Sequence, residues 1–453
     1  MDKFFKLTQN KTNVRTVIFA GVTTFMTMAY IIVVNPNMLS GFGLGLPDGV
    51  AMDWGGVFVA TILAAIIGTV MMALLANYPF ALAPGMGLNA FFIFSVVLVD
   101  NGFGWRAALT AVFIEGIIFI ILTFVNIREA LFNSIPLVLK YAVSAGIGLF
   151  IAFIGFQGAG VVIGDGATLV TVAKDLTQPS IVLAIIGLLL TSILVVKKVK
   201  GSILIGILAT WILAMIAEKI GWYVPMPDMN LFSVIPAKIV DTIPSIEPVF
   251  LKFDFSVLGN FDFWIIVFAF LFVDLFDTLG TLIGVSEKAG YLDQDGKLPK
   301  AKQALLADAI ATTAGACLGT STTTTYIESA AGVADGGRTG LTALTTAALF
   351  ALALPFSPIF MAIPAFATAP ALIIVGFYMM GSITKVNFTD FRVGIPAFLT
   401  VIVMPITYSI SEGIAFGIIS YTVINAFTGE AKKVHPLMYI LSVAFILKYI
   451  FIV

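Results

Sequence analysis

Two interrupted apolar stretches decide the fold. Residues 80–92 read FALAPGMGLNAFF, and residues 320–333 read TSTTTTYIESAAGV. Each opens with residues suited to extended backbone, because Pro84 has no N–H to donate in a helix and the threonines are β-branched. Each continues with small residues and helix formers. The pattern predicts, in both places, a short strand that turns into a half-helix near the bilayer centre, where protein or a cavity must surround it.

The composition around these stretches is that of a protein embedded in a bilayer. The chain has 453 residues, of which 60% are hydrophobic and 11% are charged, and its mean hydropathy is +1.07. Soluble domains carry roughly 25% charged residues, so this chain lacks the polar surface of a soluble protein. The single cysteine, Cys317, excludes an internal disulfide, and the single histidine, His435, excludes the usual kind of zinc site. We expect no metal, no organic cofactor and no nucleic-acid partner.

Apolar runs near the length of a spanning helix recur along the chain and predict fourteen membrane-spanning segments. A polar insert at 220–262 divides them into two halves of seven. With a cytoplasmic N-terminus, most lysines and arginines fall in inner loops, as the positive-inside rule requires. The predicted outer loops hold Arg106, Lys174, Lys219, Lys238 and Lys252. We interpret the polar N-terminal residues as a cytoplasmic lead-in, not a cleaved signal. The apolar residues 436–453 leave three paths open: spanning, re-entrant or lying on the surface.

The two halves of the chain resemble each other. Residues 135–148 and 363–376 both open with Ile-Pro and carry a glycine twelve residues after the proline. Because seven is odd, the second half enters the membrane from the opposite side, so the repeats are inverted. Inverted repeats with broken helices are typical of secondary transporters. The predicted fold is an all-α polytopic membrane protein of two inverted seven-segment repeats, with short strands in broken segments 3 and 10.

Carboxylates inside the apolar segments mark the expected site. Asp274 and Asp277 lie three residues apart in FVDLFDTLG and therefore share one helix face. Glu328 follows the threonine run, and Asn89 takes the equivalent place in the first break. A charged side chain at the bilayer centre costs about 2.5–3.5 kcal/mol on insertion scales, so such groups usually line a pathway. Asp277 has a second interpretation, in which it ties helices together with Thr278.

Two further acids lie within apolar segments, Glu115 in AVFIEGIIFI and Asp308 in LLADAIATTAG. For these residues a structural hydrogen bond to a neighbouring helix explains the sequence at least as well as contact with a ligand does. We therefore expect them to support the site, with direct contact as the alternative.

Three motifs resemble those of the nucleobase–cation symporter-2 superfamily, and most closely those of its AzgA-like branch of adenine/guanine/hypoxanthine permeases. They are FALAPGMGLNAFF, FVDLFDTLGTLIGV and GTSTTTTYIESAAGVADGGRTGLTA. The resemblance implies a core domain, segments 1–4 and 8–11, that moves against a gate domain, segments 5–7 and 12–14. The expected boundaries are 17–126 and 263–362 for the core, 135–219 and 363–428 for the gate, 220–262 for an outer loop and 429–453 for the tail.

The resemblance also implies the function, which is proton-coupled import of adenine, guanine or hypoxanthine across the inner or plasma membrane by alternating access. The substrate contacts that the resemblance implies are Asn89, Asp274 and Glu328. Gly87 lies in the first break and is a further expected contact. Phe276 and Tyr326 flank the polar groups, where each either stacks on the base or only packs in the core. The implied proton-coupling residues are Asp274, Asp277 and Glu328, with Asp274 preferred, and the residues expected to support them are Glu115, Thr278 and Asp308. A homodimer through the gate domain is implied as well.

The polar groups at the breaks suit a purine, which is a flat neutral base with ring N–H donors and ring nitrogen acceptors. Carboxylates accept from N–H groups, and an amide both donates and accepts. The main alternative is an anion transporter of the sulfate-permease type with the same fold, which would need a cation or helix dipoles and not two acids. A membrane hydrolase would need a nucleophile–base pair or metal ligands, and a channel would not need two acids at a closed site. The order of preference among the purines stays open at this point.

Overall fold

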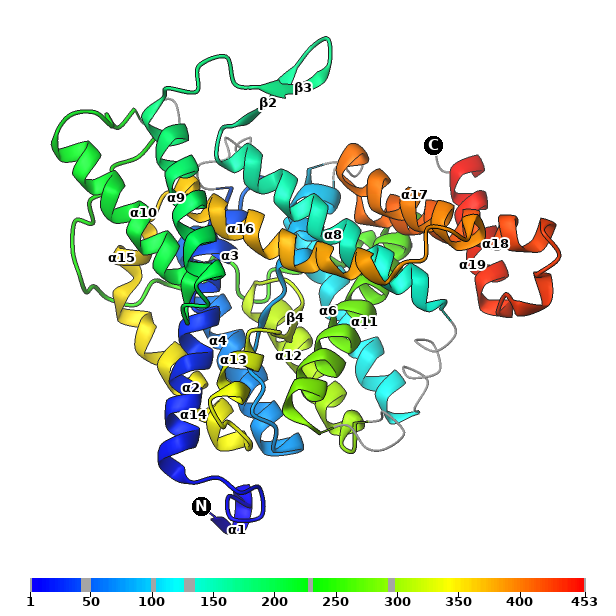
Figure 1. Cartoon of the computed structure of the whole chain (residues 1–453), viewed down its shortest axis with the longest axis horizontal. Helices are drawn as coiled ribbons and strands as arrows, with labels where there is room; N and C mark the ends of the chain where they lie inside the picture. Colours follow the sequence, from blue (N-terminus) through cyan, green and yellow to red (C-terminus); the bar gives the residue numbers. More distant parts are fainter. Residues whose placement is uncertain are drawn as a thin grey trace.

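The computed structural model describes residues 2–41, 50–98, 103–125, 135–226, 231–291 and 298–451. Within these ranges the chain is a bundle of helices with two small two-stranded sheets (Figure 1). Nine of the described helices are long and apolar enough to cross a bilayer. The predicted all-α polytopic fold is therefore confirmed.

The first half of the chain follows the predicted order of seven segments, and its third segment begins with a strand. Its elements are α1 (Asp2–Phe5), α2 (Val14–Met28), α3 (Ile31–Leu39), α4 (Trp54–Met71), the π-helical turn η1 (Met72–Ala76), β1 (Leu82–Pro84), α5 (Met86–Ala90), the π-helical η2 (Phe91–Val97), α6 (Trp105–Phe124), α8 (Leu137–Gly158), β2 (Val162–Asp165), β3 (Leu169–Val172), α9 (Pro179–Val196) and α10 (Ser202–Lys219).

The second half follows the same plan after the long loop and ends with one more helix. Its elements are η4 (Phe255–Gly259), α11 (Phe261–Ala289), α12 (Ala301–Leu318), β4 (Thr323–Thr325), α13 (Ser329–Ala334), α14 (Gly340–Ala353), η5 (Leu354–Phe356), α15 (Ser357–Met361), α16 (Ala365–Met380), η6 (Gly381–Lys385), α17 (Phe391–Thr407), α18 (Ile410–Phe427), η7 (Ala431–Lys433) and α19 (Pro436–Phe451).

Several helices begin at a polar residue placed just before an apolar run. Asn13 Oδ1 accepts from the Thr16 N–H at 3.0 Å at the start of α2. Asp53 Oδ2 accepts from the Gly56 N–H at 2.7 Å at the start of α4. Such caps satisfy N–H groups that the first helical turn leaves without a partner. The local sequence therefore sets where these segments enter the membrane.

The two interrupted segments pair with each other through their strands. β1 and β4 are antiparallel, with Leu82 opposite Thr325 and Pro84 opposite Thr323. All residues of both strands are buried. Outside the paired residues, the Tyr326 N–H donates to the Ala81 carbonyl at 3.0 Å. The short strands predicted in segments 3 and 10 are therefore confirmed, and they meet in the protein interior.

The two repeats meet at the glycines of the repeated Ile-Pro motif. A Cβ atom on Gly148 of α8 would lie 2.5 Å from the Gly376 carbonyl oxygen, and one on Gly376 of α16 would lie 2.4 Å from the Gly148 carbonyl oxygen. Such an exchange of contacts is what a twofold relation between equivalent residues produces. Only glycine lets the two helix backbones come this close, so the sequence repeat corresponds to a structural repeat.

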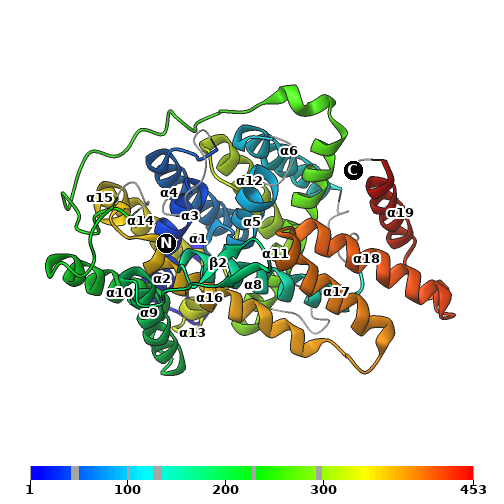
Figure 2. The ribbon, with the colours of Figure 1, turned by 90° about the horizontal axis from the view of Figure 1, so that it is seen from above.

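The helices pack in two groups. In one group, α12 packs against α4 and α6, and α14 packs against α2 and α4. In the other, α8 packs against α16 and α17, α9 against α10 and α16, and α17 against α18. From above, α4, α6 and α12 lie on one side of the molecule, and α9, α16 and α17 lie on the opposite side (Figure 2). The strand pair β1–β4 belongs to the first group and contacts α4, α11 and α12.

Candidate substrate and proton site

The candidate site is built where the strands end and the half-helices begin. Gly85 is the residue before α5, and its N–H donates to the Thr322 carbonyl at 3.0 Å. Glu328 is the residue before α13. The first turn of each half-helix therefore lies next to the strand pair. Helix N-termini carry a partial positive charge that favours electron-rich ligand atoms.

Glu328 is held by a residue that the sequence analysis did not single out. The Tyr30 hydroxyl donates to Glu328 Oε1 at 2.6 Å, and Tyr30 is only 1% exposed. Thr27 donates to the Glu328 backbone carbonyl at 3.3 Å. Both partners lie at the junction of α2 and α3, in the first segment. The only signal in the sequence is a tyrosine in an otherwise apolar run, which is too common in membrane helices to single it out.

Tyr326 connects the two breaks. Its hydroxyl donates to the Pro84 carbonyl at 2.5 Å, and its side chain is buried. Its ring centroid lies 6.5 Å from that of Tyr30. The backbone N–H and the hydroxyl of Tyr326 thus both bond to the first interrupted segment, which fixes the ring beside Glu328.

The two aspartates of α11 have different surroundings. A Cβ atom on Gly85 would lie 3.4 Å from Asp277 Oδ2, so this carboxylate reaches the first break. Asp277 is also close enough to Glu328 for their charges to interact. Asp274 is fully buried and accepts from the Thr278 hydroxyl at 2.7 Å. The structure therefore brings Asp277 to the breaks and places Asp274 beside Thr278.

Thr278 joins Asp274 to a second acid. The Thr278 hydroxyl oxygen lies 3.1 Å from Asp308 Oδ2 and 2.8 Å from the Thr324 hydroxyl oxygen of β4. Asp308, on α12, is also fully buried. Asp274, Asp308 and β4 are therefore linked through one hydroxyl group, so a change at either acid can reach the strand pair.

The first break contributes an amide with a donor to spare. Asn89 on α5 is fully buried, and its Oδ1 accepts from the Ser321 hydroxyl. Among the described residues, Asn89 Nδ2 has no hydrogen-bond partner. Gly87 faces α8, where an added Cβ would lie 2.8 Å from Ile147 Cγ2. Glu115 accepts from the Thr322 hydroxyl at 2.9 Å and so supports the strand run.

Two further expectations concern the side chain of Phe276 and the absence of a metal site. Phe276 belongs to α11, but its side chain lies outside the part of the chain that the structure describes. The described residues contain no cluster of three or more His, Cys, Asp or Glu side chains suited to a metal ion. The arrangement instead offers carboxylate acceptors, an amide donor and tyrosine rings in a buried region.

Inverted repeats, paired broken segments and acids at and beside the breaks define a secondary transporter. The sequence profile of a transporter family, described as the Permease family, matches residues 15–416. The chain therefore belongs to the nucleobase–cation symporter-2 permease family. It is therefore a transporter and not an enzyme, as the sequence predicted.

Two relatives and one solved structure place the chain within the family and its fold. It is 46% identical to guanine/hypoxanthine permease PbuG of Bacillus subtilis (strain 168), with 100% of both chains covered. It is 40% identical to adenine permease AdeP of Escherichia coli (strain K12), with 100% of this chain and 96% of the relative covered. The transmembrane domain of the cyanobacterium bicarbonate transporter BicA superposes with a TM-score of 0.64 at 14% identity, covering 90% of this chain and 97% of that one. This last likeness shows the shared fold alone.

Proposed function

We propose that this permease imports purine bases together with protons, by alternating access. The chain spans nearly the whole length of relatives named as guanine/hypoxanthine and adenine permeases. The observation that carries the proposal is the group at the breaks, where Glu328 and Asp277 offer acceptors and Asn89 offers an unpaired donor. This is the complement of a purine, which has ring N–H groups and ring nitrogens at fixed angles.

The base would lie between the two breaks and bond to both. Its ring N–H groups would donate to Glu328 and Asp277, and a ring nitrogen or exocyclic oxygen would accept from Asn89 Nδ2. A buried donor without a partner costs about 1–3 kcal/mol, and a bound base would regain part of that free energy. Tyr326, held in place by Pro84, would stack on the base.

The coupled proton would bind at the acids joined by Thr278. One hydroxyl proton cannot serve both Asp274 and Asp308 at once, although each carboxylate lies within 3.2 Å of the Thr278 oxygen. Two buried carboxylates this close repel each other, and a proton on one of them removes the repulsion. We assign that proton to Asp274. Protonation of Asp274 would change the hydrogen bonding of Thr278. The Thr278–Thr324 contact would transmit this change to β4, and through β4 to the base.

Transport would follow from movement of one helix group against the other. Both breaks, Asp274, Asp277, Asp308 and Glu328 lie in the group of α2 to α6 and α11 to α14, which corresponds to the expected core domain. The expected gate domain, α8 to α10 and α16 to α18, meets it at Gly87 and Ile147, directly beside the breaks. We also propose a cytoplasmic N-terminus, on the strength of the loop charges, and a homodimer through the gate domain.

The anion-transporter alternative rests on the fold and finds no support in the chemistry of the breaks. BicA shares the fold at 14% identity. The described side-chain hydrogen bonds at Glu328, Asn89, Thr324 and Tyr326 involve tyrosine, threonine and serine hydroxyls. The Arg338 guanidinium donates to the backbone carbonyl of Val333, at the far end of the second break. An anion would meet Asp277 and Glu328 at the same place, which would disfavour its binding.

Uptake by proteoliposomes tests the proposal directly. Purified protein should accumulate radiolabelled guanine, hypoxanthine or adenine when the outside is acidic, and accumulation should collapse with a protonophore. Bicarbonate and sulfate should neither be taken up nor compete. Accumulation driven by sodium without a proton gradient would refute proton coupling, and anion uptake without purine uptake would refute the substrate class.

A further inference from the structure

The last helix, α19, runs antiparallel beside α18 along its whole length. Residue numbers on α18 fall as the numbers of their partners on α19 rise, which is how two antiparallel helices align. Three hydrogen bonds mark this alignment, joining Thr422 to the Met438 carbonyl at 3.4 Å, Ser442 to the Ile418 carbonyl at 3.3 Å, and the Tyr449 hydroxyl to Glu412 Oε2. The contacts are spread over both helices, so α19 does not touch α18 at one end only.

The depth of α19 follows from its neighbours. α18 is long and apolar enough to cross a bilayer, and a helix aligned with it over its whole length must cross the same layer. The 16 residues of α19 span about 24 Å, against a hydrocarbon core of about 30 Å. Local thinning of the bilayer accommodates a difference of this size. Phe445 gives a second marker, because its ring lies 6.0 Å from that of Phe268, near the start of α11.

The two faces of α19 differ in chemistry. Among its exposed positions, Ile440, Val443 and Leu447 form one apolar helical stripe, each at least 46% exposed, and Ile450 lies in the last turn of the helix. The opposite face carries the hydroxyls of Ser442 and Tyr449, which bond to α18. Acyl chains suit the apolar stripe, whereas the hydroxyl face covers polar groups of α18, including the Glu412 carboxylate, that would otherwise face lipid.

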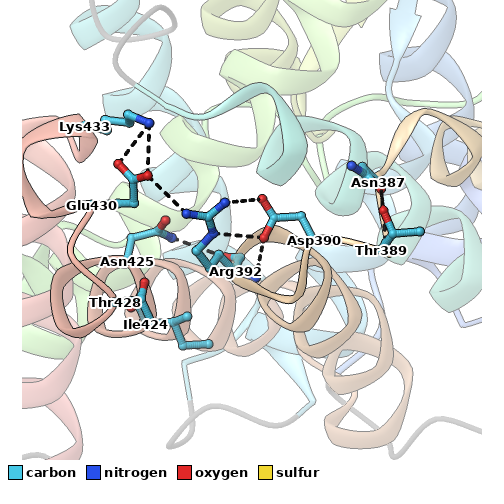
Figure 3. A network of polar contacts seen from close by, with 9 residues as sticks. All are labelled: Asn387, Thr389, Asp390, Arg392, Ile424, Asn425, Thr428, Glu430 and Lys433. Atoms are coloured by element: carbon cyan, nitrogen blue, oxygen red, sulfur yellow. Dashed lines mark hydrogen bonds and ion pairs between the residues drawn. The ribbon is translucent and has the colours of Figure 1, made fainter.

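Charged contacts hold the turn between α18 and α19 at the end where α17 begins. Glu430 accepts from Arg392 Nη1 at 3.1 Å and from Lys433 at 2.9 Å, and Asn425 donates to the Arg392 carbonyl at 3.2 Å (Figure 3). Arg392 is the second residue of α17. In Figure 1 α19 ends on the same side of the molecule as the β2–β3 hairpin, and α1 lies on the opposite side.

We propose that α19 is a fifteenth membrane-spanning segment, which places its C-terminal end on the membrane face opposite the N-terminus and turns its apolar stripe towards the acyl chains of the bilayer. This helix follows the fourteen segments of the two repeats and lies outside them. The inference rests on the contacts of α19 with α18 and α11 and does not depend on the substrate.

Three cysteine variants test the topology in the full-length protein, each made together with Cys317→Ala. Ile450→Cys marks the end of α19, Lys432→Cys marks the turn before it, and Ala167→Cys marks the tip of the β2–β3 hairpin, all at exposed positions. Intact cells are treated with a membrane-impermeant maleimide, and labelling is compared with that of permeabilised cells. Purine uptake by each variant checks that the protein has folded.

The proposal requires Ile450→Cys and Ala167→Cys to label from the same face and Lys432→Cys to label from the other. Labelling of Ile450→Cys from the Lys432 face, or from neither face, would overturn it, since α19 would then be re-entrant, surface-bound or buried. Ile440→Cys tests the lipid contact. Molecular oxygen, which dissolves in the bilayer, should increase the relaxation rate of a spin label attached at this position. Efficient disulfide crosslinking between two copies through Ile440→Cys would instead assign the stripe to a second copy of the chain.

Discussion

Replacement of Tyr30 by phenylalanine tests how the site holds its central acid. The change removes only the hydroxyl that donates to Glu328 Oε1 at 2.6 Å, and the buried ring remains. Hydrogen bonds to charged groups contribute about 1.5–3 kcal/mol, and 1.4 kcal/mol corresponds to about a factor of ten in affinity. Because this bond fixes the carboxylate that we propose to bind the base, we expect Tyr30→Phe to weaken guanine binding by about tenfold to about a hundredfold.

The assay is equilibrium binding of guanine and hypoxanthine to purified protein in detergent, followed by uptake kinetics in proteoliposomes. The matched control is Tyr449→Phe, which removes the same kind of tyrosine–glutamate hydrogen bond at Glu412, on α18. This control should leave base affinity unchanged, since Glu412 is not part of the site. A thermal unfolding curve for each variant separates loss of affinity from loss of the fold.

A double-mutant cycle with Glu328→Gln decides whether Tyr30 acts through the acid. If it does, adding Tyr30→Phe to Glu328→Gln should weaken binding much less than Tyr30→Phe does alone, since contacting residues are not additive. A Tyr30→Phe variant that binds guanine within twofold of the native protein would refute the positioning role. An equal loss in both backgrounds would show that Tyr30 acts through packing.

The remaining predictions concern the acids, the amide and the charged turn. Glu328→Gln should abolish purine uptake while the protein stays folded in the membrane, and substantial uptake at normal expression would show that the acid is structural. Asn89→Ala should weaken base binding by about fivefold to a hundredfold, the range expected for one buried hydrogen bond, with only a small change in thermal stability. Unchanged binding would show that the two breaks do not form one binding site. Asp274→Asn should destroy accumulation driven by a proton gradient yet retain exchange of base across the membrane, and continued accumulation would place the coupling proton elsewhere. Hydrogen bonding from Lys433, helped by the charge of Arg392, holds the pKa of Glu430 below its ordinary value of 4.5. The resulting stabilisation is fully present above pH 4.5 and is lost as the pH falls through the lowered pKa. Thermal stability should therefore decrease below about pH 4 in the native protein, and by less in Glu430→Gln.

The sequence was sufficient to predict the spanning segments and the two breaks, because each of these signals is local. It did not predict the β2–β3 hairpin. Pro84 and the run of threonines predict strands at the two breaks, since both resist a continuous helix. The Ile-Pro motif with its glycine predicted the repeat, and Gly148 and Gly376 do meet across it. Lipid reinforces such signals, because a spanning segment must satisfy its own backbone hydrogen bonds.

The partners of each acid could not be predicted in the same way. Asp274 and Asp277 are three residues apart, and three residues turn a helix by about 300°, so their side chains diverge by about 60°. The helical period places them on one face, yet this difference sends Asp277 to Gly85 and Asp274 to Thr278 and Asp308. Which groups occupy the two directions depends on how α11 packs against the strands and against α12.

Tyr30 and α19 show the same limit at longer range. The chain by itself determined that this is a polytopic permease with two broken segments and buried acids, because these follow from composition, periodicity and motifs. Only the tertiary structure decided that Tyr30 binds Glu328, 298 residues away, and that the last apolar run lies along α18. An apolar helix of 16 residues suits a spanning, re-entrant or surface position equally well until its neighbours are known, because burial in lipid and burial against protein favour the same side chains.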